Sequence, residues 1–407
     1  MKKLLALGLA AAMTVTGACL LASCKDDTTD GSVKVGFIAL HDENSTYDKN
    51  FIDAIEAACE KKGAELVMKT GIPEDNNCYD AAADLVDQGC DVIFADSFGH
   101  EEYILQAARE FPEVEFCHAT GTLAHTAGVA NHHNAFAHIY QGRYLAGVAA
   151  GMKLVEMHEA GELKANNYDA DGNIKIGYVG AYPYAEVVSG YTSFFLGARS
   201  IVEEETDISV SMEVTYTSSW FDETAESEGA KTLISRGAAL ISQHADSMGA
   251  PSACEAAGVP NVSYNGSTEA SCPNTFIVSS YINWEPYFEY MIDCVMNGKE
   301  IDADWTGTLA TDSVALTELG AAAAEGTAEK IEEVKAQLEA GTLNVFDCSK
   351  FTVNGEHLTT YMADVDTDDA FTPDHEAIEN GVFYESKHRS APYFDVRIDG
   401  ITELSES

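Results

Sequence analysis

The chain has few basic residues. It contains 23 Lys and Arg against 67 Asp and Glu, a net charge of −44 over 407 residues. Nucleic-acid backbones and anionic lipid headgroups are bound by clustered Lys and Arg, so an acidic chain of this kind repels both. We therefore expect no nucleic-acid partner and no attachment to a membrane through charge.

Long apolar runs are absent after residue 24. No later apolar stretch reaches the ~20 uncharged residues that a membrane-spanning helix requires. Close Cys-x-x-Cys pairs, which are typical of zinc and iron–sulfur sites, are absent as well, so we expect no cysteine metal cluster. An exported chain could instead pair some cysteines as disulfides. The eight cysteines after residue 24 are at positions 59, 78, 90, 117, 254, 272, 294 and 348.

Nucleotide-binding and hydrolase motifs are also missing. There is no GxxxxGK[ST] loop and no GxGxxG at a strand-to-helix junction. His244, Asp246 and Ser247 have the residue types of a hydrolytic triad, but they share one short segment without a nucleophile-elbow motif. The sequence therefore favours a protein that is not an enzyme and needs no cofactor. An exported nucleoside hydrolase is the alternative, with carboxylates present but no recognisable activated nucleophile.

The N-terminus has the features of an export leader. Two lysines precede a short apolar core, which ends in Leu21-Ala22-Ser23-Cys24. Small residues before a cysteine are typical of lipoprotein signal peptides, in which the cysteine becomes the lipid-carrying N-terminus. We expect residues 1–23 to be removed and residues 24–32 to form a flexible linker. The mature protein, with a net charge of −46 after loss of Lys2 and Lys3, would then be anchored to the outer face of the cell membrane through Cys24.

The mature chain alternates strand and helix patterns. Apolar strand patterns at 33–40 and 174–180, for example, precede helical patterns at 50–62 and 186–203. Such alternation predicts an α/β fold with parallel sheets covered by helices on both faces. The patterns further predict a strand at 127–131, a helix near 321–340 and a hairpin at 351–360 around Asn354-Gly355.

Two lobes are expected, because about 380 mature residues exceed the usual size of one domain. We assign residues 33–138 and about 282–310 to lobe I, and residues 139–281 and about 311–407 to lobe II. Ligands of parallel sheets bind beyond the carboxyl ends of the strands. The pattern therefore predicts a ligand cleft between the lobes, lined by the loops that follow the strands.

These loops are rich in aromatic, carboxylate and amide side chains. A planar ligand can stack between rings, and carboxylates can accept hydrogen bonds from ring N–H or amino groups. This combination suits a nucleobase or nucleoside, although stacked rings and acidic acceptors suit sugars too. For Phe98, Phe221 and Tyr264, packing between helix and sheet is an equal expectation. The candidates are Tyr47, Phe98, Trp220, Phe221, Tyr264 and Trp284 for stacking, and Ser97, Asp222, Asp246 and Asn265 for hydrogen bonding.

Five histidines between residues 118 and 138 raise the question of a zinc site. They are at positions 118, 125, 132, 133 and 138. The adjacent His132 and His133 point to opposite faces of an extended segment, so their spacing does not support shared coordination. We expect no metal site.

Several longer segments occur in a fixed order along residues 33–350. They are 91–99 (DVIFADSFG), 110–121 (EFPEVEFCHATG), 139–147 (IYQGRYLAG), 176–180 (IGYVG), 217–222 (TSSWFD), 241–247 (ISQHADS) and 262–265 (VSYN). In these segments the chain resembles the basic membrane lipoprotein (BMP) family of ABC-transporter substrate-binding proteins, in the branch near purine-binding members. The resemblance implies a type I periplasmic-binding-protein fold and delivery of a purine base or nucleoside to a membrane permease with cytoplasmic ATPases. By motif match it implies ligand contacts at Ser97, Phe98, Trp220, Phe221, Asp222, His244, Asp246 and Asn265.

The loop after the first strand departs from that branch, which usually has a Gly- and Trp-containing loop whose ring helps to stack the ligand. Here the loop is His41-Asp-Glu-Asn-Ser-Thr-Tyr47, and Tyr47 is the candidate replacement for that ring. The additional Asp42 and Glu43 leave base, nucleoside and sugar open as ligands. Residues 393–400 depart from the family as well. We expect a monomer that serves a permease, with a ligand sensor for a receptor kinase as the alternative.

Overall fold

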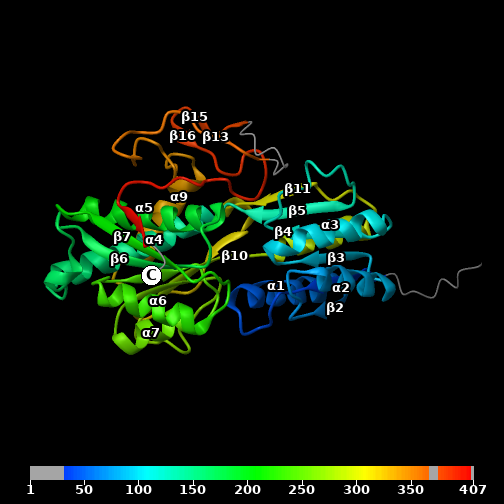
Figure 1. Ribbon diagram of the computed structural model, residues 1–407, viewed down its shortest axis with the longest axis horizontal. Helices are drawn as coiled ribbons and strands as arrows, with labels where there is room; N and C mark the ends of the chain where they lie inside the picture. The colour runs from blue at the N-terminus through cyan, green and yellow to red at the C-terminus, as the bar shows by residue number, and fades with distance from the viewer. Residues whose placement is uncertain (1–31, 366–374, 405–407) are drawn as a thin grey trace, which may run out of the picture. The chain divides into compact units, whose positions relative to one another are not determined.

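The computed structural model describes residues 32–365 and 375–404. Its first large sheet has six parallel strands with helices packed against it (Figure 1). The strand order is β11 (Asp304–Gly307), β5 (His132–Ala137), β4 (Glu115–Ala119), β3 (Val92–Ala95), β1 (Lys34–Ile38) and β2 (Glu65–Lys69). The helices of this part, which we call lobe I, are α1 (Thr46–Lys62), α2 (Asn76–Asp87), α3 (Glu101–Glu110) and α8 (Glu285–Met296).

The second large sheet has seven strands and defines lobe II. All its neighbours are parallel except β12, which pairs antiparallel with β10. The order is β12 (Val314–Leu316), β10 (Phe276–Ile282), β9 (Asn261–Tyr264), β8 (Ile241–Gln243), β6 (Ile174–Gly180), β7 (Val210–Tyr216) and β17 (Ile401–Glu403). Its helices are α4 (Ile139–Glu159), α5 (Ala185–Glu205), α6 (Glu223–Ser235), α7 (Gly249–Ala257) and α9 (Thr327–Glu339).

The chain passes between the two sheets three times. It leaves the first sheet after β5, returns after β10, and leaves again after β11. Both sheets belong to one compact unit that begins at Val33. The predicted α/β fold with parallel sheets is confirmed, and the carboxyl ends of strands from both sheets can contribute to one site.

Three predicted elements differ from the structure. The strand predicted at 127–131 is wrong, because this stretch turns back on Leu123 and the strand is β5, whose His and Asn residues are buried. At 351–360 the turn forms, but a single bridge between Val353 and Glu356 replaces the hairpin, since Asp399 accepts hydrogen bonds from the turn N–H groups. The helix near 321–340 begins only at Thr327, after Gly326 with a φ of 79°.

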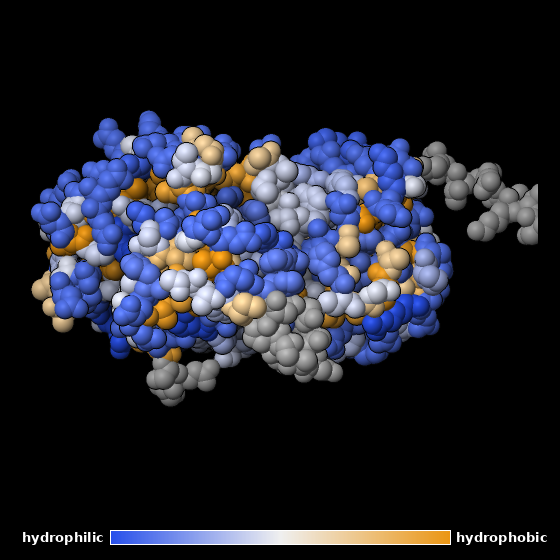
Figure 2. Space-filling view, turned by 90° about the horizontal axis from the view of Figure 1, so that it is seen from above, coloured by the Kyte–Doolittle hydropathy of each residue, from blue (hydrophilic) through white to orange (hydrophobic). Residues whose placement is uncertain are grey.

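The C-terminal segment, of which residues 343–365 and 375–404 are described, contacts both lobes. Phe346 stacks on Phe394 at 4.2 Å, and β17 extends the second sheet beside β7. The Ser390 N–H donates to the carboxylate of Asp304 in β11 at 2.9 Å, which ties the segment to the first sheet. Hydrophilic residues cover most of the face seen in Figure 2, in keeping with the acidic composition.

Helices α4 and α5 approach closely because glycines face each other across their crossing (Figure 1). A Cβ on Gly147 would lie 2.1 Å from the carbonyl oxygen of Phe194, and one on Gly197 would lie 2.2 Å from that of Tyr144. Backbone at this distance cannot move aside without separating the helices. The contact therefore depends on the absence of side chains at both positions.

We predict that Gly147→Ala destabilises the protein by about 2–3 kcal/mol, since overpacking forces the two helices apart. Gly229→Ala in α6 is the control, because its Cβ would first meet a methyl group of Thr215 at 3.1 Å. There the gain in helix propensity offsets the tighter packing, and the change should stay within about 1 kcal/mol. Urea unfolding of both variants measures this, and equal effects would contradict the assignment of the crossing.

Candidate functional site

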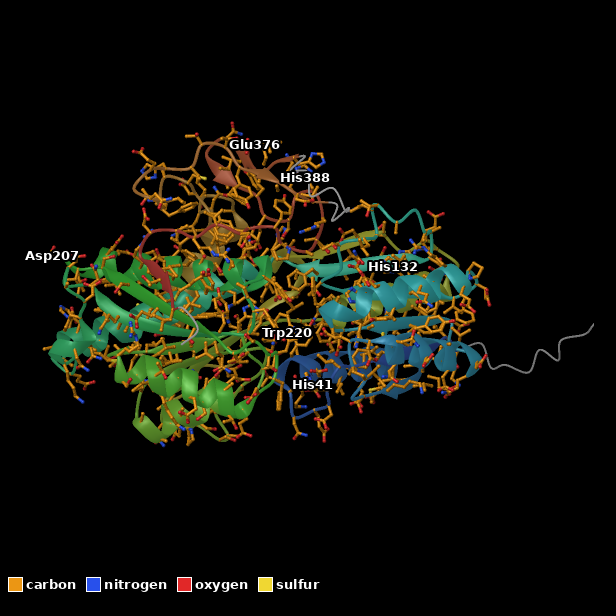
Figure 3. All side chains as sticks on the ribbon, viewed as in Figure 1. His41, His132, Asp207, Trp220, Glu376 and His388 are labelled. Atoms are coloured by element: carbon orange, nitrogen blue, oxygen red, sulfur yellow. The ribbon has the colours of Figure 1, made fainter. Side chains whose placement is uncertain are left out.

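A narrow cavity, with a volume of about 20 Å³, lies where loops of the two lobes meet. Most of its lining residues follow the carboxyl ends of strands. Figure 3 shows His41 of lobe I and Trp220 of lobe II near each other at this junction. The lining residues are Leu40, His41, Tyr47, Asp48, Ser97, Phe98 and Thr120 from lobe I, and Glu186, Trp220, His244, Asp246 and Tyr264 from lobe II.

Seven of the eleven predicted ligand contacts line this cavity: Tyr47, Ser97, Phe98, Trp220, His244, Asp246 and Tyr264. Two more lie just behind or beside it. Asn265 donates from its amide to the Asp246 carboxyl at 3.4 Å, and the Phe221 ring lies 5.4 Å from the ring of His41 across the lobe junction. The structure therefore brings nine of the eleven predicted residues to one place.

Asp222 and Trp284 have other positions and need correction. The Asp222 carboxylate accepts the N–H of Ala225 at 2.9 Å and caps the N-terminus of α6. Trp284 is 1% exposed and stacks on Phe51 at 4.4 Å within the lobe I core. Strand-end position alone misassigned both, because capping and core packing also require residues at strand and helix ends.

Five lining residues were not among the sequence candidates: Leu40, His41, Asp48, Thr120 and Glu186. His41 and Thr120 lie on loops that the strand pattern had placed at the cleft. Glu186 is in the first turn of α5, and nothing in its sequence context distinguishes it from a helix-start carboxylate that favours the N-terminal dipole. Tyr264, proposed equally for stacking or packing, does line the cavity.

Buried carboxyl groups dominate the electrostatics of lobe I at the cavity. Burial raises the pKa of Asp96 well above its usual value, and the nearby Asp48 adds to this rise. Burial also opposes ionisation of Asp48, but hydrogen bonds from His41 and Ser45 outweigh it and lower the pKa of Asp48. His41 donates its backbone N–H to Asp48 at 2.7 Å. Asp48 is thus the ionised member of the pair.

Asp246 lies at the point where the lobes touch. Its backbone carbonyl accepts hydrogen bonds from the N–H and the hydroxyl of Thr46, both at 3.1 Å. Burial raises the pKa of its side chain well above the usual value, and the charges of Asp48, Glu226 and Glu186 raise it further. A carboxyl group in this setting can donate as well as accept a hydrogen bond.

Aromatic rings form the wall at the lobe junction. Tyr182 and Tyr184 stack at 5.1 Å, and the Trp220 ring lies 5.2 Å from that of Tyr182. Phe98 of lobe I faces Tyr184 at 5.4 Å, and both rings are more than 40% exposed. Exposed rings beside a cavity are suited to stacking on a ligand.

Three of the six described residues other than glycine with a left-handed backbone lie at or near the cavity. Thr120, Ser218 and Asn265 follow β4, β7 and β9 and have φ values of 62°, 56° and 66°. This conformation costs about 1–3 kcal/mol for residues other than glycine and persists where the surroundings enforce it. The next residue, Gly121, is tightly enclosed, since an added Cβ would lie 2.4 Å from oxygens of Glu101 and Asn134.

Metal and disulfide chemistry find no support in the described residues. Within residues 32–365 and 375–404, no group of three His, Cys, Asp or Glu side chains is arranged to hold a metal ion. The eight cysteines of this part are free thiols and buried. Among the helices in the same ranges, none is both long and apolar enough to cross a membrane.

The profile of a known family matches residues 35–342 of the chain. That family is described as ABC transporter substrate-binding protein, PnrA-like (Bmp). The chain belongs to this family. Its members are substrate-binding proteins of transporters rather than enzymes, so the prediction of a non-enzymatic protein is confirmed. The match ends before the C-terminal segment, which begins at residue 343.

Two relatives of this chain are named for different ligands. A purine-binding protein of Brucella abortus is 30% identical over 271 residues, which cover 65% of this chain and 69% of the relative. A putative ABC transporter glucose-binding protein of Haloferax volcanii is 30% identical over 262 residues, 64% of this chain and 60% of the relative. The chain therefore matches less than two thirds of the length of the second relative.

Solved structures show the same fold. A solute-binding protein of an ABC transporter from Conexibacter woesei aligns with a TM-score of 0.60 at 22% identity, over 77% of this chain and 98% of its own. A solute-binding protein from Aeropyrum pernix aligns with a TM-score of 0.62 at 15% identity, over 76% and 92%. At these identities the likeness shows the architecture of the two lobes and no ligand.

The C-terminal segment places a carboxyl group, Glu385, close behind the cavity. Glu385 is 2% exposed, and its Oε2 has no hydrogen-bond partner among the described residues. Burial raises its pKa to about 8, a hydrogen bond with Ser189 opposes the rise, and the charge of Glu186 adds to it. The protonated form is therefore the stable one in the folded protein at neutral pH.

We predict that the Glu385 carboxyl group makes the free energy of unfolding depend on pH. Its pKa is higher in the folded than in the unfolded chain, so its favourable contribution is complete below about pH 4.5 and is lost as the pH rises towards about 8. The change is about 4–5 kcal/mol. Glu385→Gln should flatten the pH dependence of the free energy of unfolding over this range. Glu113→Gln, at an exposed position, is the control and should not. An unchanged slope in Glu385→Gln would contradict the prediction.

Proposed function

We propose that the protein captures a purine base or nucleoside in the cavity between its lobes and delivers it to an ABC permease. The observation that carries this proposal is the composition of the lining. Four rings, from Tyr47, Phe98, Trp220 and Tyr264, share the cavity with carboxyl groups of Asp48, Glu186 and Asp246. The purine-binding relative from Brucella abortus supports the same ligand class.

A purine fits this lining chemically. Its two flat faces can stack between rings, and its N–H and amino groups can donate to carboxylates. The protonated form of Asp246 can in turn donate to a ring nitrogen. Each such group would be left unsatisfied by an analogue that lacks the partner, at a cost of about 1–3 kcal/mol. Specificity would therefore come from paired polar groups in a site with little water.

Closure of the lobes would present the bound form to the permease. Thr46 bonds Asp246, Phe98 faces Tyr184, and His41 faces Phe221, so every one of these contacts joins a residue of lobe I to one of lobe II. A ligand held by both lobes favours the closed state by its difference in affinity for the two states. The permease would distinguish this closed form from an open one.

The location is part of the proposal. Cys24 lies outside the described residues, and the export leader with its lipobox supports cleavage before this residue and attachment of diacylglycerol and palmitate. The protein would then act as a monomer on the outer face of the cell membrane, next to its permease and the cytoplasmic ATPase subunits. The lipid rather than surface charge would hold it there, because the chain is strongly acidic.

A sugar is the second candidate ligand. Rings that stack on a purine also stack on a pyranose, and carboxylates accept hydrogen bonds from hydroxyl groups. The glucose-binding relative from Haloferax volcanii favours this alternative. A ligand panel separates the two candidates.

We predict that the purified protein is stabilised by adenine, guanine or their nucleosides and not by glucose, galactose or ribose. A ligand that binds only the folded state raises the melting temperature by mass action, and about 2.7 kcal/mol is gained at 100 times the Kd. Thermal unfolding with each compound gives the class, and titration calorimetry gives the affinity. Stabilisation by sugars alone would replace the purine with a sugar and leave the site assignment standing.

Variants test the site itself with the ligand that the panel identifies. Asp246→Ala and Trp220→Ala should each weaken binding more than about tenfold, because each removes a lining group from a desolvated cavity. Asp222→Ala is the matched control for the carboxylate. It should cost about 1 kcal/mol of stability through the lost cap of α6 but leave affinity unchanged. Wild-type affinity in both lining variants would exclude this cavity as the site.

We predict that Cys24→Ala abolishes labelling of the protein by radioactive palmitate in cells and moves it from the membrane to the soluble or unprocessed fraction. The chain offers a matched control in Cys19, the other cysteine of the leader, which is preceded by Thr16-Gly17-Ala18. Cys19→Ala should keep both labelling and membrane association. Retained labelling in Cys24→Ala would disprove anchoring at this position.

A further inference from the structure

Arg143 is a cation buried directly behind the cavity wall. It lies on α4, is 0% exposed, and donates from its guanidinium to the carbonyl oxygen of Gln243 at 2.9 Å. Its Cζ lies 4.4 Å from the centre of the Tyr264 ring, and Tyr264 lines the cavity. A second hydrogen bond of the same Nη2 goes to the hydroxyl of Tyr178 in β6. A buried charge of this kind requires a structural or functional reason.

A chain of hydrogen bonds leads from Arg143 to the cavity. The Tyr178 hydroxyl lies 3.2 Å from Nδ1 of His244, and Nε2 of His244 lies 3.0 Å from Oε1 of Glu186. Both His244 and Glu186 line the cavity. Hydrogen bonds thus link four residues one after another: Arg143 of α4, Tyr178 of β6, His244 of the loop after β8 and Glu186 of α5.

The chemistry of each group indicates which atom donates and which accepts in this series of hydrogen bonds. A guanidinium can only donate, so the Tyr178 oxygen accepts from Arg143. Among the described residues, Nδ1 of His244 is the one partner of this hydroxyl that can accept its hydrogen. Nδ1 is therefore an acceptor, and in the neutral ring the proton lies on Nε2, from which it is donated to Glu186. Both ring nitrogens are used, and His244 offers the ligand only its ring.

We propose that Arg143 is a positioning residue for ligand binding: through Tyr178 it holds His244 as the neutral Nε2–H tautomer, which orients Glu186 with its second oxygen available to a hydrogen-bond donor of the ligand. This inference rests on the proposed function in taking the cavity as the ligand site. It assigns a role to Arg143 and Tyr178, neither of which lines the cavity.

The surroundings of His244 support the neutral ring. Burial lowers the pKa of His244, Glu186 opposes this, and the charge of Arg143 lowers the pKa further. The ring has no freedom to rotate away, because it rests on Gly190 of α5, where an added Cβ would lie 2.8 Å from Nδ1. The titratable groups that face the ring are Arg143 from α4, Tyr178 from β6, Glu186 from α5 and Tyr264 from β9. Asp246, from the same loop as His244, shares the cavity lining with it.

Loss of Arg143 would change the state of the ring. The Tyr178 oxygen would be released to accept a hydrogen bond, and no cation would oppose protonation of Nδ1. A doubly protonated imidazolium could then bridge Tyr178 and Glu186 as pH falls towards 6, within the range where histidine charges readily. Glu186 would be paired with a full positive charge and would be a weaker acceptor for the ligand.

Nitrogen NMR of the histidine-labelled protein tests the inference without any ligand. His244 is identified by the signals that disappear in His244→Gln. In the wild-type protein we expect an unprotonated Nδ1 and a protonated Nε2 from about pH 8 down to about pH 5.5. Arg143→Met should show both nitrogens protonated at the acidic end, and Arg143→Lys, which keeps the charge, should retain the neutral tautomer.

Adenine binding to the same proteins gives the functional readout. Its affinity should change less than about twofold between pH 7.5 and 5.5 in the wild-type protein and fall about fivefold in Arg143→Met. A wild-type ring with its proton on Nδ1 would overturn the inference even if Arg143→Met fails to fold, and so would an Arg143→Met ring that stays neutral. Absence of adenine binding in all variants, with the expected NMR pattern, would instead contradict the ligand assignment alone.

Discussion

The free-energy cost of burying carboxyl groups where the two sheets meet is the constraint on which this structure depends. Asp96 and Asp246 are almost fully buried at strand ends, and desolvation disfavours their charged forms. Their neighbours lower this cost by local hydrogen bonds, such as the Leu40 N–H to Asp96 at 3.2 Å and the Asn265 amide to Asp246. The same loops carry the strained φ angles of Thr120 and Asn265. Buried ionisable groups with raised pKa values are common at functional sites, and here Asp246 lines the proposed ligand cavity while Asp96 lies next to Ser97 of its lining.

The family profile ends at residue 342, yet the segment after it is built into both lobes. Ser390 bonds Asp304 of the first sheet, β17 completes the edge of the second, and Glu403 accepts hydrogen bonds from Tyr191 and Tyr216. Any opening of the lobes must therefore either carry this segment along with lobe II and break the Ser390 contact, or bend it. Its buried Glu385 lies near Glu186, whose negative charge helps to keep the Glu385 carboxyl group protonated.

Sequence patterns located most of the fold because strands and helices of a parallel sheet are long and periodic, as in β6 and α5. They failed at β5, where buried His132, His133 and Asn134 interrupt the apolar pattern that marks a strand. At the site, aromatic and acidic residues at strand ends pointed to Tyr47, Trp220 and Asp246, whereas Glu186 and Asp48 lie in the first turns of helices, where carboxylates are common for helix-dipole reasons. Trp284 and Asp222 were expected at the site because they lie near strand ends, but Trp284 packs in the core of lobe I and Asp222 caps α6. The role of Arg143 could not be predicted at all, because it depends on contacts among four separate elements.

If the cavity is the ligand site, the arrangement of its charges disfavours closure of the lobes unless a ligand is bound. Asp48 belongs to lobe I, Glu186 and Asp246 to lobe II, and the charges of Asp48 and Glu186 both raise the pKa of Asp246. Bringing the lobes together without a ligand therefore either forces like charges into proximity or requires uptake of a proton. A ligand with several N–H donors in one plane satisfies carboxyl groups from both lobes and removes that penalty, so its binding energy and the closure of the lobes become one event. If this cavity is the ligand site, a ligand without hydrogen-bond donors would leave the charges of Asp48 and Glu186 unpaired, so the donors of the ligand would contribute to selectivity.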